Sequence, residues 1–167
     1  IEAINPRLPQ SNLIEFFSLE FHTNGLLRNK NIASDLLPHG LSMIIELIGK
    51  REITQLNEQV SENNYKCNFY YGNCLVEFDF LESKDVEKKL RFRVNDVSYL
   101  RVQEGNLSEY KVFIQDCKLG EKIPVIDPFE VYISRFLEFC KTSPTKRKDT
   151  FEESSYNMEL MADILLS

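Results

Sequence analysis

The sequence predicts a single α+β domain over residues 1–167, built from an antiparallel sheet with helices packed on one face. The segment 65–81 has the alternation and the central turn of a β-hairpin. Further alternating segments surround it, and the last third of the chain has helical periodicity. The chain has 167 residues, of which 43% are hydrophobic, so it can bury a sizeable core. We therefore expect a β-meander centred on the hairpin 65–81, preceded by an extended arm at residues 1–10.

The hairpin 65–81 predicts its own register. A two-residue turn at Gly72-Asn73 suits the positive φ angles that a tight turn requires. This turn sets Lys66 opposite Asp79, and opposite charges in that position stabilise a strand pair. The other face carries only aromatic, aliphatic and cysteine side chains. A slip of one residue would place charges among them, so the register should be firm.

The segments before the hairpin are less uniform. The segment 13–22 alternates between apolar and polar side chains in its second half and predicts a strand, while its first half also fits a helix. Residues 26–37 predict a short helix that ends before Pro38. The apolar run 41–48 and the segment 52–60 fit a helix or a strand equally well, because a short buried run has no decisive period. Both segments stay open.

The segment that follows the hairpin predicts a third strand. Residues 89–94 alternate cleanly, with basic side chains on one face. We expect this strand to pair with residues 75–80, so that its basic face lies beside Glu77 and Asp79. Two shorter alternating segments extend the meander, namely 98–103 and 109–115.

The clearest helix covers residues 128–141. Asp127 is a favourable N-cap, and the apolar residues recur at a spacing of three and four, which predicts a stripe packed on the core. The stripe consists of Phe129, Tyr132, Ile133, Phe136, Leu137 and Cys140. A basic loop is expected at residues 146–148. A last helix is expected to begin near Thr150 or Ser155.

Composition excludes several classes of protein. A net charge of −6 argues against a general nucleic-acid binder, which needs a basic surface. No apolar run approaches the roughly 20 residues that span a bilayer, so no membrane association is expected. The four cysteines form no CxxC pair, which argues against a zinc site, and we interpret them as reduced core thiols of a cytoplasmic protein. No metal and no cofactor are expected.

Catalytic motifs are absent from the sequence. It contains no GxSxG, GxxxxGK[ST], HExxH or GxGxxG pattern. His39 follows a proline and is expected in a loop, as a surface or helix-end histidine; a nucleophilic pair with Cys140 is the alternative. Glu77 and Asp79 form either the solvated face of the hairpin or an acid–base or metal-binding pair. We therefore predict no catalytic residue and no enzyme.

The favoured function is that of a protein-binding inhibitor. An acidic chain without a catalytic motif suits a bacterial immunity protein or antitoxin that neutralises a basic, nuclease-type toxin by direct binding, since opposite charges accelerate association. A secretion-type chaperone or escort protein is the alternative, followed by a small enzyme with a site assembled from distant residues. The expected partner-binding residues lie on the hairpin and on the acidic face of the last helix: Tyr70, Leu75, Glu77, Asp79, Glu152, Glu153, Glu159 and Asp163.

Overall fold

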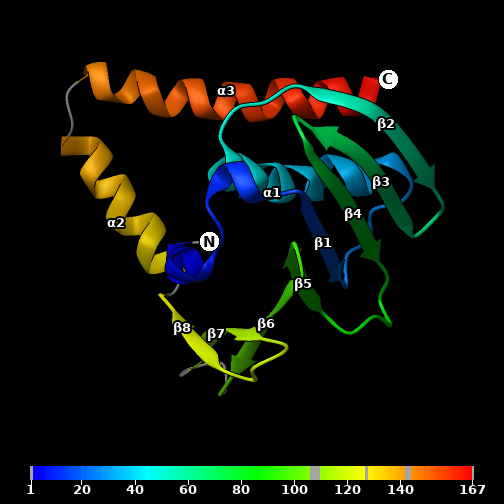
Figure 1. The fold of residues 1–167 in the computed structure, drawn as a ribbon, viewed down its shortest axis with the longest axis horizontal. Coiled ribbons are helices and arrows are strands. Elements are labelled where there is room, and N and C mark those ends of the chain that lie inside the picture. The colour runs from blue at the N-terminus through cyan, green and yellow to red at the C-terminus, as the bar shows by residue number, and fades with distance from the viewer. Residues whose placement is uncertain (1, 106–109, 127, 142–143, 167) are drawn as a thin grey trace.

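A computed structural model describes residues 2–105, 110–126, 128–141 and 144–166 of the chain (Figure 1). Over these residues the chain forms one eight-stranded sheet, three α-helices and two short 3-10 helices. The strands are β1 (Phe16–Thr23), β2 (Ile53–Val60), β3 (Asn64–Tyr71), β4 (Cys74–Glu82), β5 (Lys89–Val94), β6 (Val97–Glu104), β7 (Lys111–Asp116) and β8 (Lys122–Val125). The α-helices are α1 (Lys30–Ile48), α2 (Pro128–Lys141) and α3 (Pro144–Leu166), and the 3-10 helices are η1 (Glu2–Arg7) and η2 (Ser11–Leu13).

The sheet is mixed, and the predicted antiparallel meander is wrong. The strand order is β2-β3-β4-β1-β5-β6-β7-β8, in which β1 runs parallel to β4 and antiparallel to β5. The strand 89–94 therefore pairs with β1 and not with β4. A parallel pair needs a long crossover connection, and here α1, β2 and β3 lie between the two strands in the chain. Alternation identifies a strand but does not specify which strand lies beside it.

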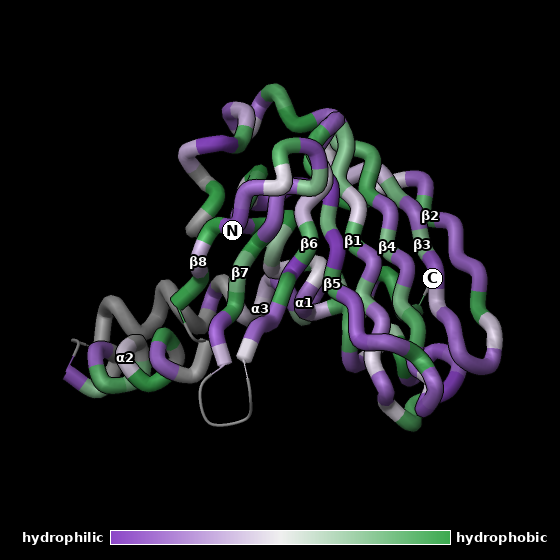
Figure 2. Tube along the Cα trace, turned by 90° about the horizontal axis from the view of Figure 1, so that it is seen from below, coloured by the Kyte–Doolittle hydropathy of each residue, from purple (hydrophilic) through white to green (hydrophobic). Residues whose placement is uncertain are grey.

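The hairpin register is confirmed. Tyr71 lies opposite Cys74, and Lys66 lies opposite Asp79 with its Nζ 2.7 Å from Oδ2 of that carboxylate. Gly72 has a φ of 61°, as the turn requires. Figure 2 shows the alternation of hydrophobic and hydrophilic residues along these strands. The apolar side of this alternation forms the inner face of the sheet, which α1 covers, and the polar side forms the outer face.

Helix α1 runs straight through Pro38, so the predicted short helix ends too early and the open segment 41–48 is helical. The carbonyl oxygen of Pro38 accepts hydrogen bonds from Ser42 Oγ at 2.6 Å and from Asn157 Nδ2 at 3.2 Å. Gly40 lets the helix approach the sheet, since a Cβ there would lie 2.6 Å from the ring of Phe78. Tertiary packing thus outweighs the helix-breaking tendency of proline.

The molecule has three layers on its β1–β4 side. Helix α1 packs on the inner face of β1, β3 and β4, and α3 packs on α1 (Figure 1). The open segment 52–60 is the edge strand β2. Residues 146–148, predicted as a loop, belong to α3, which begins at Pro144. Among the described residues, Asn157, Leu160 and Ile164 supply the buried side of α3.

Helix α2 exists as predicted, but the described residues of its apolar stripe are exposed instead of buried in the core. Ile133, Phe136 and Leu137 are 56%, 55% and 52% exposed. Both overall views place α2 at the margin of the molecule, beyond β8 (Figures 1 and 2). The predicted cap Asp127 and the side chains of Phe129 and Tyr132 lie outside the described part. Amphipathic periodicity therefore identified the helix but not the layer it covers.

The N-terminal segment, for which an extended arm was expected, contains the 3-10 helix η1. Ile4 is buried, and Arg7 forms an ion pair with Glu121 next to β8. Within the described residues, no helix is both long enough and apolar enough to cross a membrane.

Candidate functional site

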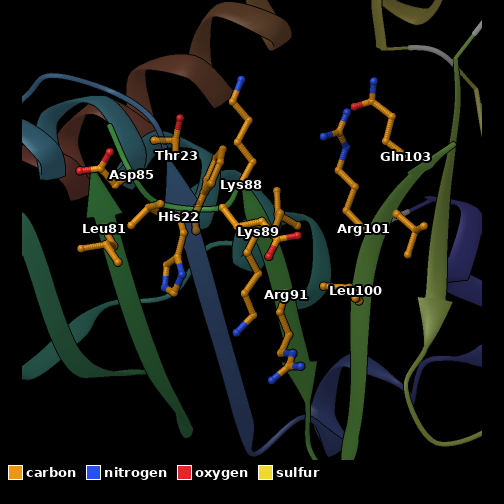
Figure 3. Close-up of a pocket in the computed structure, with 15 residues that line it drawn as sticks. His22, Thr23, Leu81, Asp85, Lys88, Lys89, Arg91, Leu100, Arg101 and Gln103 are labelled. Atoms are coloured by element: carbon orange, nitrogen blue, oxygen red, sulfur yellow. The ribbon is translucent and has the colours of Figure 1, made fainter. Parts of the chain in front are cut away.

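A cleft of about 850 Å³ opens where β5 and β6 separate (Figure 3). The pairing of these strands ends at Arg91 opposite Leu100, while β5 continues beside β1 and β6 continues beside β7. We call this opening the β5–β6 cleft. Its lining residues come from β1, the end of β4, the β4–β5 connection, β5 and β6: Phe21, His22, Thr23, Leu81, Asp85, Val86, Glu87, Lys88, Lys89, Leu90, Arg91, Leu100, Arg101, Val102 and Gln103.

The cleft has two halves, because successive residues of a strand project to opposite faces of a sheet. The inner half lies on the side of α1, where Arg101 and Gln103 continue the face of the buried Tyr99. In Figure 3 their side chains point to the same side as those of Thr23 and Lys88. The outer half carries the side chains that point the other way, namely His22, Lys89 and Arg91.

The cleft is rich in cations although the chain as a whole carries a charge of −6. Four lining residues are basic and two, Asp85 and Glu87, are acidic. On the outer half, Lys89 binds Glu20, and Arg91 lies 3.9 Å from the same carboxylate. The single Glu20 carboxylate is therefore shared by two cations, and it balances only part of their positive charge.

Arg101 and Lys88 differ from the cations of the outer half. Neither forms an ion pair with any residue that the structure describes. Arg101 is exposed on β6, and Lys88 lies directly before β5. The inner half of the cleft thus presents two positive charges that have no ion-pair partner in the described part of the chain, and such charges favour an anionic ligand.

His22 lies in the outer half among charged neighbours. Burial lowers its pKa from the ordinary 6.5, and Lys89 acts in the same direction, while the Asp79 carboxylate opposes the change. A lowered pKa keeps the imidazole neutral at pH 7. A neutral imidazole can accept a proton, so His22 is chemically competent as a base.

His39 is in the middle of α1, not in a loop as expected. Its ring lies 5.5 Å from the ring of Phe21, centre to centre, at an interplanar angle of 61°. Phe21 in turn lines the cleft. Asp35 precedes His39 by four residues, which places both exposed side chains on one face of the helix. The structure therefore sets the His39 imidazole against Phe21, one of the residues that line the cleft.

The spacing Asp35-x-x-x-His39 was present in the sequence but was not interpreted as a pair. The predicted helix ended before Pro38, which separated the two residues into a helix and a loop. Only a helix that continues through Pro38 makes the spacing meaningful. The spacing of Asp35 and His39 therefore indicates a pair only when tertiary packing keeps the helix intact at Pro38.

The predicted partner-binding residues fall on two different layers. Tyr70 and Leu75 lie opposite each other near the hairpin tip, and Tyr70 is 38% exposed. Glu77 is exposed, whereas Asp79 is half-buried and binds Asn64 and Lys66, each at 2.7 Å. The remaining predicted residues belong to α3, on the far side of α1 from the sheet: Glu152, Glu153, Glu159 and Asp163.

These eight residues do not gather into one patch. Glu152, Glu159 and Asp163 are exposed, and the side chain of Glu153 lies outside the described part. A role in partner binding stays a prediction for each of them. As for metals, no group of three or more His, Cys, Asp or Glu side chains in the described chain is placed to hold an ion.

Comparison with known proteins gives no match at the level of sequence: no family model and no curated protein matches the chain. Solved structures do match. The candidate oxidoreductase YPO2259 from Yersinia pestis aligns with a TM-score of 0.54 and 14% identity, over 94% of this chain and 55% of its own. KijD10, a 3-ketoreductase from Actinomadura kijaniata in complex with TDP-benzene and NADP, aligns with a TM-score of 0.57 and 13% identity, over 90% and 51%. The candidate oxidoreductase yhhX aligns with a TM-score of 0.58 and 13% identity, over 99% and 59%.

At these identities the likeness concerns the fold, and this chain spans only a little more than half the length of the three proteins. The fold nevertheless overturns the predicted immunity protein or antitoxin, its basic toxin partner, and the prediction that the chain is no enzyme. The solved structures named above that share this architecture are oxidoreductases, one of them a ketoreductase. The escort-protein alternative is set aside for the same reason.

Residues 1–167 do not fit a dinucleotide such as the NADP of that ketoreductase. A dinucleotide-binding unit has a mostly parallel sheet and a glycine-rich turn between its first strand and helix, where the pyrophosphate sits. This sheet has one parallel pair. In the β1–α1 connection, the buried Glu82 carboxylate lies against Gly25 and accepts the Leu27 backbone N–H at 2.8 Å. A carboxylate there repels pyrophosphate.

Proposed function

We propose that residues 1–167 form the substrate-binding half of an oxidoreductase, working with a dinucleotide-binding unit that lies outside these residues. Two observations support this. Nearly the whole chain aligns with little more than half of each neighbour, which leaves each of them a further unit of similar size. The fold described here lacks the features that hold a dinucleotide itself. The substrate then binds in the β5–β6 cleft.

The observation that carries the proposal is the position of His39 beside that cleft. Interconversion of a carbonyl and an alcohol moves a proton at the substrate oxygen, and a positioned side chain must supply or accept it. Histidine is the side chain most often used for this task at neutral pH. Asp35 stands one turn away from His39 on the same helical face, and both side chains are exposed.

His39 is a better candidate for this role than His22. His22 lies in the outer half with Lys89 and Arg91, which share the Glu20 carboxylate. Arg101 and Lys88, which have no ion-pair partner among the described residues, belong to the inner half. His39 contacts Phe21, which lines the cleft. A substrate held by the inner half presents its oxygen to His39.

The same proposal places the protein in the cytoplasm. Cys67 and Cys74 are buried thiols in the core and form no disulfide with each other. Reduced core cysteines are typical of proteins that work in a reducing compartment.

The test uses the natural chain that carries these residues and a panel of keto sugars, nucleotide-linked keto sugars and 2-oxo acids. Nicotinamide absorbance follows turnover in the wild type, in His39→Asn and in the matched control His22→Asn. We expect His39→Asn to lower kcat by about 100-fold or more, which is the usual contribution of a general acid–base group. Dinucleotide affinity should stay the same, and His22→Asn should retain kcat within about threefold.

Two results would contradict the assignment. Equal activity of His39→Asn and the wild type would remove His39 from the chemistry. A loss confined to His22→Asn would move the reaction to the outer half of the cleft.

A further inference from the structure

The inner half of the β5–β6 cleft brings together cationic and neutral hydrogen-bond donors from three segments. Arg101 and Gln103 come from β6, Thr23 from the end of β1 and Lys88 from the residue before β5. Figure 3 shows these four side chains pointing to one side of the sheet. A guanidinium, an ammonium, an amide and a hydroxyl together offer donors to several oxygens of one group.

The charge balance of the cleft selects the sign of that group. Among the lining cations, Lys89 and Arg91 already share Glu20, whereas Arg101 and Lys88 form no ion pair with a described residue. Of the two acidic lining residues, Asp85 lies at the opposite end of the cleft from Arg101 (Figure 3), and Glu87 directly precedes Lys88 in the chain. The four basic lining residues outnumber these two. Two like charges that share one concave surface gain most from a bound anion.

We propose that this inner half binds a phosphate or diphosphate group of the substrate, with Arg101 as the principal contact and Lys88 as the second. Guanidinium groups suit phosphate oxygens because their donors form a planar fork, and lysine adds a mobile point charge. The cleft volume of about 850 Å³ exceeds the space that a phosphate needs and leaves room for the part of the substrate that reacts. That the bound anion belongs to the substrate rests on the proposed function. The presence of an anion site does not.

Inorganic pyrophosphate is the probe, titrated into the natural chain that carries residues 1–167 and followed by calorimetry and by amide NMR shifts. Malonate serves as the carboxylate comparison. The variants are Arg101→Gln, Lys88→Gln and the control Lys118→Gln, which makes the same charge change at an exposed position outside the cleft. The thermal midpoint of each variant checks that the fold persists, which is expected because these side chains are exposed.

The inference predicts saturable pyrophosphate binding with shifts at β6 and at residue 88, and malonate binding that is weaker. Arg101→Gln should raise the Kd about tenfold, Lys88→Gln should raise it less, and Lys118→Gln should leave it within about twofold. Absence of saturable binding would overturn the inference. So would an unchanged Kd in Arg101→Gln, or malonate binding as tight as that of pyrophosphate.

The anion measurement and the turnover measurement fail independently. If pyrophosphate binds through Arg101 but the natural chain transfers no hydride, the anion site is supported and the proposed oxidoreductase is refuted. Turnover that depends on His39, without anion binding at Arg101, would retain the enzyme and refute the phosphate-bearing substrate.

Discussion

At the scale of residues, the two core cysteines have properties that follow from their position in the strands. Cys67 and Cys74 lie on the apolar face of the hairpin and are 3% and 2% exposed. Burial raises the pKa of the Cys67 thiol to about 12 and that of the Cys74 thiol to about 11. Because only the thiolate reacts, both groups should be inert in the folded protein.

Labelling with iodoacetamide at pH 8 tests this directly. Cys117, which is exposed, should be modified within minutes, whereas Cys67 and Cys74 should react only after denaturant is added. Peptide mass spectrometry gives the extent at each position. Equal labelling rates for Cys67 and Cys117 in the native protein would show that the hairpin face is not buried.

The same raised pKa values predict how stability depends on pH. In the unfolded chain these thiols lose their protons near their ordinary pKa of 9.0, while the folded state keeps them protonated up to about pH 11 to 12. The folded state therefore binds more protons between these limits, and the free energy of unfolding falls as the pH rises through this window. Their full contribution is present below pH 9. Denaturant midpoints measured between pH 7 and pH 11 check the sign.

At the scale of elements, β1 is paired with β4 and β5, and one side chain in the β5–β6 turn adds hydrogen bonds to the start of that strand. Asn95 Oδ1 accepts the backbone N–H groups of Glu15 at 3.0 Å and Phe16 at 3.1 Å. Its Nδ2 donates to the carbonyl oxygen of Leu13 at 2.9 Å. Its φ of 49° is a left-handed conformation that asparagine tolerates better than most residues. Asn95 thus fixes the start of β1 to the neighbouring turn.

Replacement of Asn95 separates the two contributions. Asn95→Ala loses the three side-chain hydrogen bonds and also strains the backbone, so the free energy of unfolding should fall by about 2–3 kcal/mol. Asn95→Gly loses the same bonds but accepts the positive φ, so it should recover about 1 kcal/mol of that loss. Urea denaturation gives both values. A fall below about 0.5 kcal/mol in Asn95→Ala would mean that β1 is held in place by its strand pairing alone.

The elements that the sequence predicted correctly are those whose signals are local. The register of the hairpin follows from the Gly72 turn and from alternation, and helix α2 follows from its periodicity. The position of β1 in the sheet depends on pairing between segments that are distant in the chain. Alternation of apolar and polar residues does not indicate which strand lies beside it. The apolar face of α2 shows the same limit, because Phe136 obeys the pattern of a core residue and is exposed.

At the scale of the whole molecule, the candidate site arises from features that no short segment contains. The β5–β6 cleft exists because two strands diverge after Arg91 and Leu100, and each continues beside a different neighbour. His39 contacts Phe21, a lining residue, because α1 continues through Pro38 and packs closely at Gly40. The sequence therefore allowed a prediction of helices and strands but not of this site. The net charge of −6 favoured a basic partner, whereas basic residues outnumber acidic residues in the lining of the β5–β6 cleft.

We propose that this chain supplies the substrate-binding half of an oxidoreductase. Hydride transfer, measured in the natural chain that carries residues 1–167, tests this proposal. The protein is incubated with nicotinamide dinucleotides deuterated on either face of C4 and with the carbonyl panel described above, and products are analysed by mass spectrometry. Deuterium should appear on the carbinol carbon of the product from only one face of one dinucleotide. The transfer rate should fall by about 100-fold or more in His39→Asn. Absence of both dinucleotide binding and deuterium transfer across the panel would contradict the proposal.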